Sequence, residues 1–180
     1  MLFRSFKNHI YLLDALKLLH ASGFLLHAVF TGNDFGIQSY LTAQGEKYEL
    51  SEYIHWGGFV TERLLRALYR CALAMTMPTY YGSTNIPPLE AFFMRCPVCY
   101  SDLPGLREQV EDAAFLLDLN TPCSLVDAIL KIKHEDPIVE EKKLKGIRLL
   151  EKYSSEIPYW EVLDSIFSSF KNKMRTWCEV

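Results

Sequence analysis

Residues 72–92 contain the pattern that most restricts the fold of this chain. The apolar run 72–77 (ALAMTM) ends at Pro78, and a short apolar run closed by proline is typical of a buried strand. Residues 82–85 (GSTN) form a polar loop, and Pro87 and Pro88 then fix φ for the first turn of a helix. In an open α/β sheet, ligands bind beyond the carboxyl ends of the strands, and a helix N-terminus favours an anion. The pattern therefore predicts an α/β fold with a site for a diphosphate at this loop.

Other segments alternate in the same way along the chain. Further strands are predicted at 25–31, 53–56, 98–101 and 114–117. Helices are predicted at 8–20, 35–47, 61–71, 87–94, 106–110, 124–133, 137–153 and within 157–177, with Asn8, Thr61 and Ser124 as N-caps. Alternating strands and helices indicate βαβ units and one parallel sheet of five or six strands flanked by helices. We expect a Rossmann-like domain at 1–156, followed by a C-terminal helix at 157–180.

Composition and charge exclude several classes of protein. The 180 residues are 49% hydrophobic and 23% charged, as in an ordinary globular domain. The net charge of −3 gives no field that would recruit nucleic acid, so none is expected as a partner. No apolar run approaches the length of a membrane span, so we expect no transmembrane segment and a cytoplasmic location.

The cysteines and glycines bring no metal or redox motif. The five cysteines include the pair Cys96 and Cys99, which has redox spacing but leads into a predicted strand instead of opening a helix. We therefore interpret these two as buried apolar residues, and the odd count as free thiols in a reducing compartment. No second pair completes a zinc set, and no GxGxxG or Walker loop is present.

A resemblance to a known family rests on the same polar loop. Residues 78–91 (PTYYGSTNIPPLEA) resemble the nucleotide-sugar signature of the family 4, or group 1, retaining glycosyltransferases, and 96–108 (CPVCYSDLPGLRE) and 112–114 (DAA) continue the resemblance. The signature has two glutamates, of which the second matches Glu90 and the first falls on Gly82. The run TNIPP is similar to that of a branch that includes mannosyl-type transferases of surface polysaccharide synthesis.

The resemblance implies the C-terminal, donor-binding half of a two-domain architecture called GT-B, with its first strand truncated to residues 1–3. Such an enzyme would transfer a sugar, such as mannose or glucose, from a GDP- or UDP-linked donor to a glycan or lipid-linked acceptor, with retention. It would use no metal or bound cofactor. The acceptor half would be absent from this chain or lie on a partner chain, and residues 157–180 would brace it. Peripheral association with the inner membrane face is part of the same expectation.

The resemblance also assigns residues. Lys7 matches the lysine that binds the diphosphate, and Glu90 matches the carboxylate that accepts hydrogen bonds from the ribose hydroxyls, so these two are the expected catalytic residues. The expected nucleotide-sugar-binding set is Arg4, Lys7, Gly32, Phe59, Val60, Gly82, Ser83, Thr84, Asn85, Ile86 and Glu90. Because Gly82 lacks a side chain, Thr84 or Asn85 is expected to contact the sugar instead.

Without the family resemblance, the same residues also fit ordinary structural roles. Arg4 and Lys7 would then be a solvated pair of charges, and Glu90 a carboxylate in the favourable field of a helix N-terminus. Phe59 and Val60 would simply pack at a strand end. At the level of the whole chain, the alternatives are a nucleotide-sugar-binding module without transfer activity, a truncated inactive fragment, and a scaffold domain without a ligand.

Overall fold

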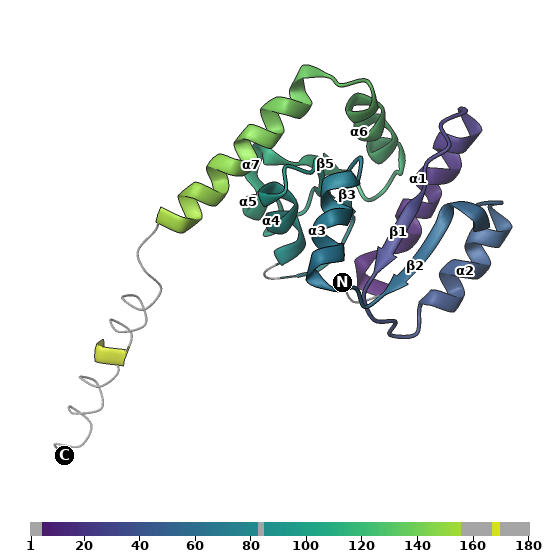
Figure 1. Cartoon of the computed structure of the whole chain (residues 1–180), viewed down its shortest axis with the longest axis horizontal. Coiled ribbons are helices and arrows are strands. Elements are labelled where there is room, and N and C mark those ends of the chain that lie inside the picture. The colour runs from purple at the N-terminus through teal and green to yellow at the C-terminus, as the bar shows by residue number, and fades with distance from the viewer. Residues whose placement is uncertain (1–4, 83–84, 156–166, 170–180) are drawn as a thin grey trace, which may run out of the picture.

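A computed structural model describes residues 5–82, 85–155 and 167–169 as an α/β molecule (Figure 1). The strands are β1 (Ala28–Thr31), β2 (Ile54–Gly58), β3 (Met75–Met77), β4 (Val98–Ser101) and β5 (Phe115–Leu117). The helices are α1 (His9–Ala21), α2 (Gln38–Lys47), α3 (Glu62–Cys71), α4 (Ile86–Phe93), α5 (Arg107–Val110), α6 (Cys123–Lys133) and α7 (Pro137–Ser155). Short 3-10 helices are η1 (Ser5–Lys7), η2 (Ser51–Tyr53) and η3 (Glu111–Ala113). The expected boundary at 156–157 lies outside the described residues.

The strands are all parallel, as predicted, but they form two sheets instead of one. One sheet has the order β1-β2 and the other β3-β4-β5. In a doubly wound sheet of order 3-2-1-4-5-6, the first strand lies between the second and the fourth. β1 and β3 correspond to the second and the fourth strand of that order, and the described residues supply no strand between them. The prediction of a single sheet is therefore wrong for this part of the chain.

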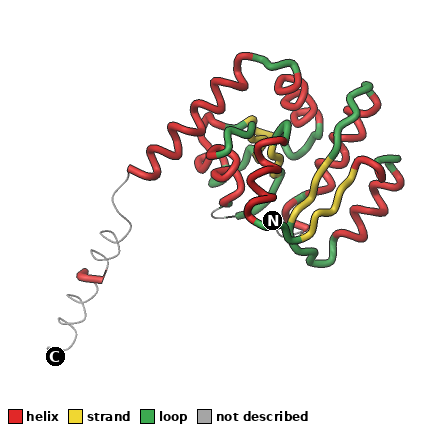
Figure 2. Tube along the Cα trace, in the orientation of Figure 1, coloured by secondary structure: helices red, strands yellow, loops and turns green. Residues whose placement is uncertain are grey.

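The core consists of three apolar clusters, and α1 joins two of them. One face of α1 contributes Tyr11, Ala15 and Leu19 to a cluster with β5 and α6. The other contributes Leu13 and Leu16 to a cluster with β1, β2 and α2. The third cluster lies among β3, β4, α4 and α7. Figure 2 shows helices on both sides of the strands, as this division requires.

Two of the three predicted helix caps are wrong. The hydroxyl of Thr61 accepts from Leu64 N at 3.3 Å, which confirms it as a cap. Asn8 instead adopts a left-handed conformation with φ 52° and makes no side-chain cap bond. Ser124 lies inside α6, where its Oγ is 2.7 Å from Tyr11 Oη, so its hydroxyl links α6 to α1.

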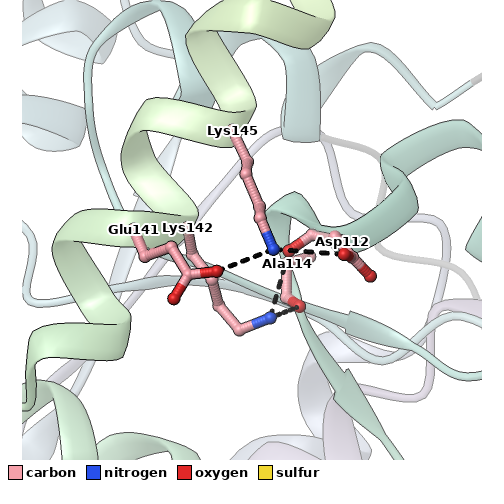
Figure 3. Close-up of polar contacts among 5 residues, drawn as sticks. All are labelled: Asp112, Ala114, Glu141, Lys142 and Lys145. Carbon is pink, nitrogen blue, oxygen red and sulfur yellow. Dashed lines mark hydrogen bonds and ion pairs between the residues drawn. The ribbon is translucent and has the colours of Figure 1, made fainter.

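Lysine side chains fasten α7 to the turn before β5 (Figure 3). Lys142 Nζ donates to the carbonyl oxygens of Ala114 at 2.9 Å and Asp112 at 3.1 Å. Lys145 Nζ pairs with the carboxylates of Asp112 at 3.1 Å and Glu141 at 2.8 Å. α7 also packs on α4, so it supports the helix that follows the signature loop.

Candidate functional site

The loop after β3 is tied to the 3-10 helix η1. Tyr80 N donates to Phe6 O at 2.8 Å, and the fully buried Thr79 donates its hydroxyl to Tyr81 O at 2.7 Å. Ser101, at the end of β4, donates its hydroxyl to Thr79 O at 2.6 Å. These bonds place η1, and therefore the residue at its end, beside the loop at the carboxyl edge of the sheet.

Lys7 ends η1, and its side chain reaches the N-cap residue of α4. Lys7 Nζ donates to Asn85 Oδ1 at 2.9 Å. Asn85 makes no side-chain cap bond to α4; its Oδ1 accepts from Lys7, and its Nδ2 donates to Tyr100 Oη at 2.6 Å. The N-cap side chain thus binds the lysine instead of the helix. This bond joins two of the residues that the sequence singled out.

Gln109 holds Asn85 in place from the other side. Gln109 Nε2 donates to Asn85 O at 2.6 Å, and its Oε1 accepts from Asn85 N at 3.3 Å and from Tyr100 Oη at 3.2 Å. Asn85 is 5% exposed and Tyr100 is fully buried, so these bonds are shielded from water. Tyr100 and Gln109 were not predicted, since nothing in their local sequence indicates this long-range contact.

Gly82 and Asn85 share one small volume. Gly82 has a φ of 152°, a conformation that favours glycine. An ideal Cβ at position 82 would lie 2.8 Å from Asn85 Cγ, which is too close for any real contact. Asn85 thus occupies space next to Gly82 that the first glutamate of the signature would need.

Glu90 lies on α4 and accepts a hydrogen bond from Tyr69 Oη to its Oε2 at 2.9 Å. Burial and the adjacent carboxylate raise the pKa of Tyr69, so its hydroxyl stays protonated and donates. Glu90 also lines a cavity together with Thr31, Pro78 and Pro87. The carboxylate therefore faces a space at the carboxyl edge, and its second oxygen remains as an acceptor there. Like Tyr100 and Gln109, Tyr69 was not predicted from the sequence.

The electrostatics of η1 favour an anion. Lys7 is half-buried, and this desolvation lowers its pKa from the ordinary value. Burial, with Lys7 next in effect, lowers the pKa of His9 to about 4, so His9 is neutral near pH 7. An anion next to Lys7 would offset the cost of its partial burial. Pro87 and Pro88 have no N–H groups, so Lys7, and not the first turn of α4, is the candidate phosphate contact here.

The remaining predicted residues form a separate group at the end of β1 and β2. Gly32 N donates to Gly58 O at 2.7 Å, and Phe59 and Val60 follow directly. Phe59 is 85% exposed, so it packs on very little of the described protein. Ile86, at the start of α4, is also exposed. The other predicted residues, Arg4, Ser83 and Thr84, lie outside the described residues.

The two spaced cysteines are inert thiols, as predicted. Cys96 and Cys99 are buried, and burial raises their pKa values to about 11 and about 12. Within residues 5–82, 85–155 and 167–169, no group of three or more His, Cys, Asp and Glu side chains could hold a metal ion. No helix in that part of the chain is long and apolar enough to cross a membrane.

Residues 1–135 match the sequence model of the family Glycosyl transferases group 1. The chain belongs to this glycosyltransferase family. The match covers the loop, α4 and the strands on either side, so it confirms the resemblance drawn from the signature. The O-antigen chain mannosyltransferase B of Escherichia coli is 29% identical over 104 residues, which are 58% of this chain and 27% of that protein.

Solved glycosyltransferase structures share the fold. The C-terminal domain of the group 1 family protein LpcC from Francisella tularensis superposes with a TM-score of 0.71 at 16% identity, covering 87% of this chain and 84% of that domain. HepE from Anabaena, solved with UDP, has a TM-score of 0.74 at 18% identity, covering 96% of this chain but 47% of HepE. The chain therefore has the GT-B fold of a C-terminal domain. It spans about a quarter of the mannosyltransferase and less than half of HepE.

Proposed function

We propose that this chain forms the donor-binding half of a retaining glycosyltransferase. It would bind a nucleoside diphosphate sugar and present it for transfer to a glycan or lipid-linked acceptor. The observation that carries the proposal is the hydrogen bond from Lys7 to Asn85, which brings a half-buried cation to the first residue of α4. A cation at a helix N-terminus suits a diphosphate leaving group.

Each residue of the site has a role in this reaction. The difficult step is departure of the nucleoside diphosphate from the anomeric carbon, during which negative charge grows on the phosphate oxygens. Lys7 would stabilise that charge, and the positive end of the α4 dipole would add to its effect. Glu90 would accept hydrogen bonds from a vicinal diol such as the ribose hydroxyls, while Tyr69 holds its Oε2.

The proposal extends to the nucleotide base of the donor and to the acceptor. HepE was solved with UDP and the curated relative is named a mannosyltransferase, so UDP- and GDP-linked sugars are both candidate donors. An acceptor must be held against the anomeric carbon, and one half of a cleft cannot orient it. We therefore expect the isolated chain to bind a donor weakly and to need a further domain or partner chain, at the inner membrane face, for transfer.

Calorimetry with UDP and GDP tests the binding half of the proposal. Glu90→Gln should weaken binding by about 1–3 kcal/mol, the cost of losing a charged hydrogen bond. The matched control is Glu151→Gln, an exposed carboxylate on α7, which should leave the affinity unchanged. Equal affinities for Glu90→Gln and the parent chain would remove Glu90 from the site.

The pH dependence of the same titration tests Lys7. Because burial lowers its pKa, Lys7 should lose its proton, and the donor its affinity, at a lower pH than an ordinary lysine would. Lys7→Gln should weaken binding near neutral pH and remove this loss at higher pH. The exposed Lys131→Gln is the control and should keep the parent profile. A parent profile that persisted in Lys7→Gln would contradict the assignment.

A binding module without transfer activity is the second candidate, and Gly82 favours it. The signature glutamate that would contact the sugar is absent, and Asn85 fills part of its space. A transfer assay with candidate sugar nucleotides and glycan acceptors, run on the full-length protein, separates the two. Donor binding without any transfer would favour the module.

A further inference from the structure

The side chain of Asn85 is an amide whose two ends have opposite hydrogen-bonding capacity. Its Oδ1 only accepts and its Nδ2 only donates. The ammonium of Lys7, which can only donate, lies 2.9 Å from Oδ1. If the amide were turned over, two donors would face each other and Lys7 would lose this acceptor. The contact between Lys7 and the start of α4 therefore depends on which end of the Asn85 amide points at the lysine.

The orientation of the Gln109 side chain is fixed by the backbone of Asn85. Gln109 Nε2 donates to Asn85 O at 2.6 Å, and Gln109 Oε1 accepts from Asn85 N at 3.3 Å. A backbone carbonyl only accepts and a backbone N–H only donates, so turning the Gln109 amide over would break both bonds. The atom that lies 3.2 Å from Tyr100 Oη is therefore Oε1, which is an acceptor.

The Tyr100 hydroxyl links Gln109 to the Asn85 amide. Burial raises the pKa of Tyr100, so the phenol keeps its one proton. Because Gln109 Oε1 accepts this proton, the lone pairs of the phenol oxygen remain for a donor. Asn85 Nδ2 donates to that oxygen at 2.6 Å and to Gly82 O at 3.4 Å. With Nδ2 held on this side, Oδ1 points to Lys7.

These bonds lie in the protein interior, where water does not replace a lost partner. Tyr100 is fully buried on β4, where the ladder pairs it with Met77 of β3, and Asn85 is only 5% exposed. Removal of the phenol oxygen would leave Asn85 Nδ2 with the long bond to Gly82. A buried donor without a good partner is costly, so the amide would rotate or move towards another acceptor. Either movement takes Oδ1 away from Lys7.

We propose that Tyr100 is a positioning residue of the diphosphate site. Its hydroxyl, oriented by Gln109, keeps the oxygen of the Asn85 amide towards Lys7 and so holds the lysine ammonium at the start of α4. Tyr100 is buried and acts through Asn85 without touching the donor. The inference rests on the proposed function of Lys7 as the diphosphate contact, and it extends the site to two residues outside 78–91.

Competitive acetylation followed by peptide mapping tests the positioning without any nucleotide, since it gives the pH at which each lysine becomes half reactive. Tyr100→Phe should move the midpoint of Lys7 to a lower pH than in the parent chain, because the ammonium form loses its acceptor oxygen. The exposed Lys131 in the same samples should keep its midpoint. The Phe6 ring, 5.3 Å from Lys7 Nζ, and His9, which burial keeps neutral above pH 4 or so, are unchanged in this variant.

Calorimetry with UDP and GDP tests the consequence for the donor. Tyr100→Phe should weaken nucleotide binding by about three- to tenfold. In an Asn85→Ala background, where no amide remains to be oriented, the same change should have an effect of less than about twofold. Tyr11→Phe is the matched control, because it also removes a buried, hydrogen-bonded phenol oxygen, but one between α1 and α6. It should lower stability in urea and leave the Lys7 midpoint and the nucleotide affinity unchanged.

A second variant and the two measurements together make the inference separable from the proposed function. Gln109→Met removes the acceptor of the Tyr100 proton and should shift the Lys7 midpoint in the same direction. An unchanged midpoint in Tyr100→Phe and Gln109→Met, or an equal shift in Tyr11→Phe, would overturn the positioning role even where Lys7→Gln weakens nucleotide binding. Nucleotide binding that neither Tyr100→Phe nor Lys7→Gln affects would instead overturn the diphosphate site, and with it the place of Tyr100 in that site.

Discussion

The close approach of Asn85 to Gly82 predicts that a side chain at position 82 would lower the stability of the protein. Gly82→Ala should cost more than any ordinary surface substitution, for two separable reasons. The backbone at position 82 has a φ of 152°, which strains a residue with a Cβ by roughly 1 kcal/mol. The new Cβ also requires the side chain of Asn85 to leave its place.

The cost of displacing Asn85 follows from its hydrogen bonds. Its bond from Lys7 involves a charge and is worth about 1.5–3 kcal/mol, and its bond to Tyr100 about 1 kcal/mol. With the backbone strain, Gly82→Ala should lower the free energy of unfolding by roughly 3.5–5 kcal/mol. In an Asn85→Ala background, no side chain needs to move, so the same change should cost only the strain of roughly 1 kcal/mol.

Urea denaturation of the four proteins in this double-mutant cycle measures the coupling. Gly23→Ala is the control for strain alone, because Gly23 has a φ of 84° and an ideal Cβ there meets no atom within 4 Å. It should cost about as much as Gly82→Ala does in the Asn85→Ala background. If Gly82→Ala cost the same with and without the Asn85 side chain, the steric argument would be refuted.

Three further predictions concern other contacts. Tyr69→Phe should weaken donor binding in calorimetry by about 0.5–1.5 kcal/mol, because the Glu90 carboxylate loses the hydrogen bond that fixes its orientation; an unchanged affinity would contradict this role. Gly146→Ala should lower the free energy of unfolding by about 1–3 kcal/mol in urea, since its Cβ would lie 2.6 Å from the ring of Phe92; an unchanged midpoint would contradict this. Because burial lowers the pKa of His9 from 6.5 to about 4, the unfolded chain takes up a proton first, so stability should be complete above pH 6.5 and fall by roughly 2–4 kcal/mol towards pH 4. The change of the denaturation midpoint with pH should be much smaller for His9→Gln than for the parent chain. An equal change in both would assign the pH dependence to other groups.

The sequence predicted local elements well because their signals are local. β4 has the predicted bounds, since its apolar run is short and flanked by Pro97 and Asp102. β1 begins three residues later than the apolar run 25–31, because Leu25 lies exposed before the strand. The break between the two sheets depends on which segments lie side by side, and an alternation of strands and helices carries no information about that.

The site was predictable only as far as the signature reaches. Glu90 and Asn85 follow from the signature, and Lys7 follows from the family resemblance, since its own sequence context suggests a solvated charge. Tyr69 and Gln109 contribute through contacts 21 and 24 residues away along the chain, which no local pattern encodes. The lack of space for a Cβ at Gly82 could not be predicted either, because it depends on the rotamer of the Asn85 side chain.

The break between the sheets has a consequence for how the molecule comes apart. No backbone ladder crosses from β2 and β1 to β3 in the described part of the chain, so α1 is the main element that couples the two sides through its opposite faces. Cooperativity between two such units is limited by the contacts they share. The unit of β1, α2 and β2 should open at lower free energy than the unit around β4, and native-state hydrogen exchange should resolve them as two foldons. The contacts of α1 with both sides would then set how far apart the two openings lie in free energy.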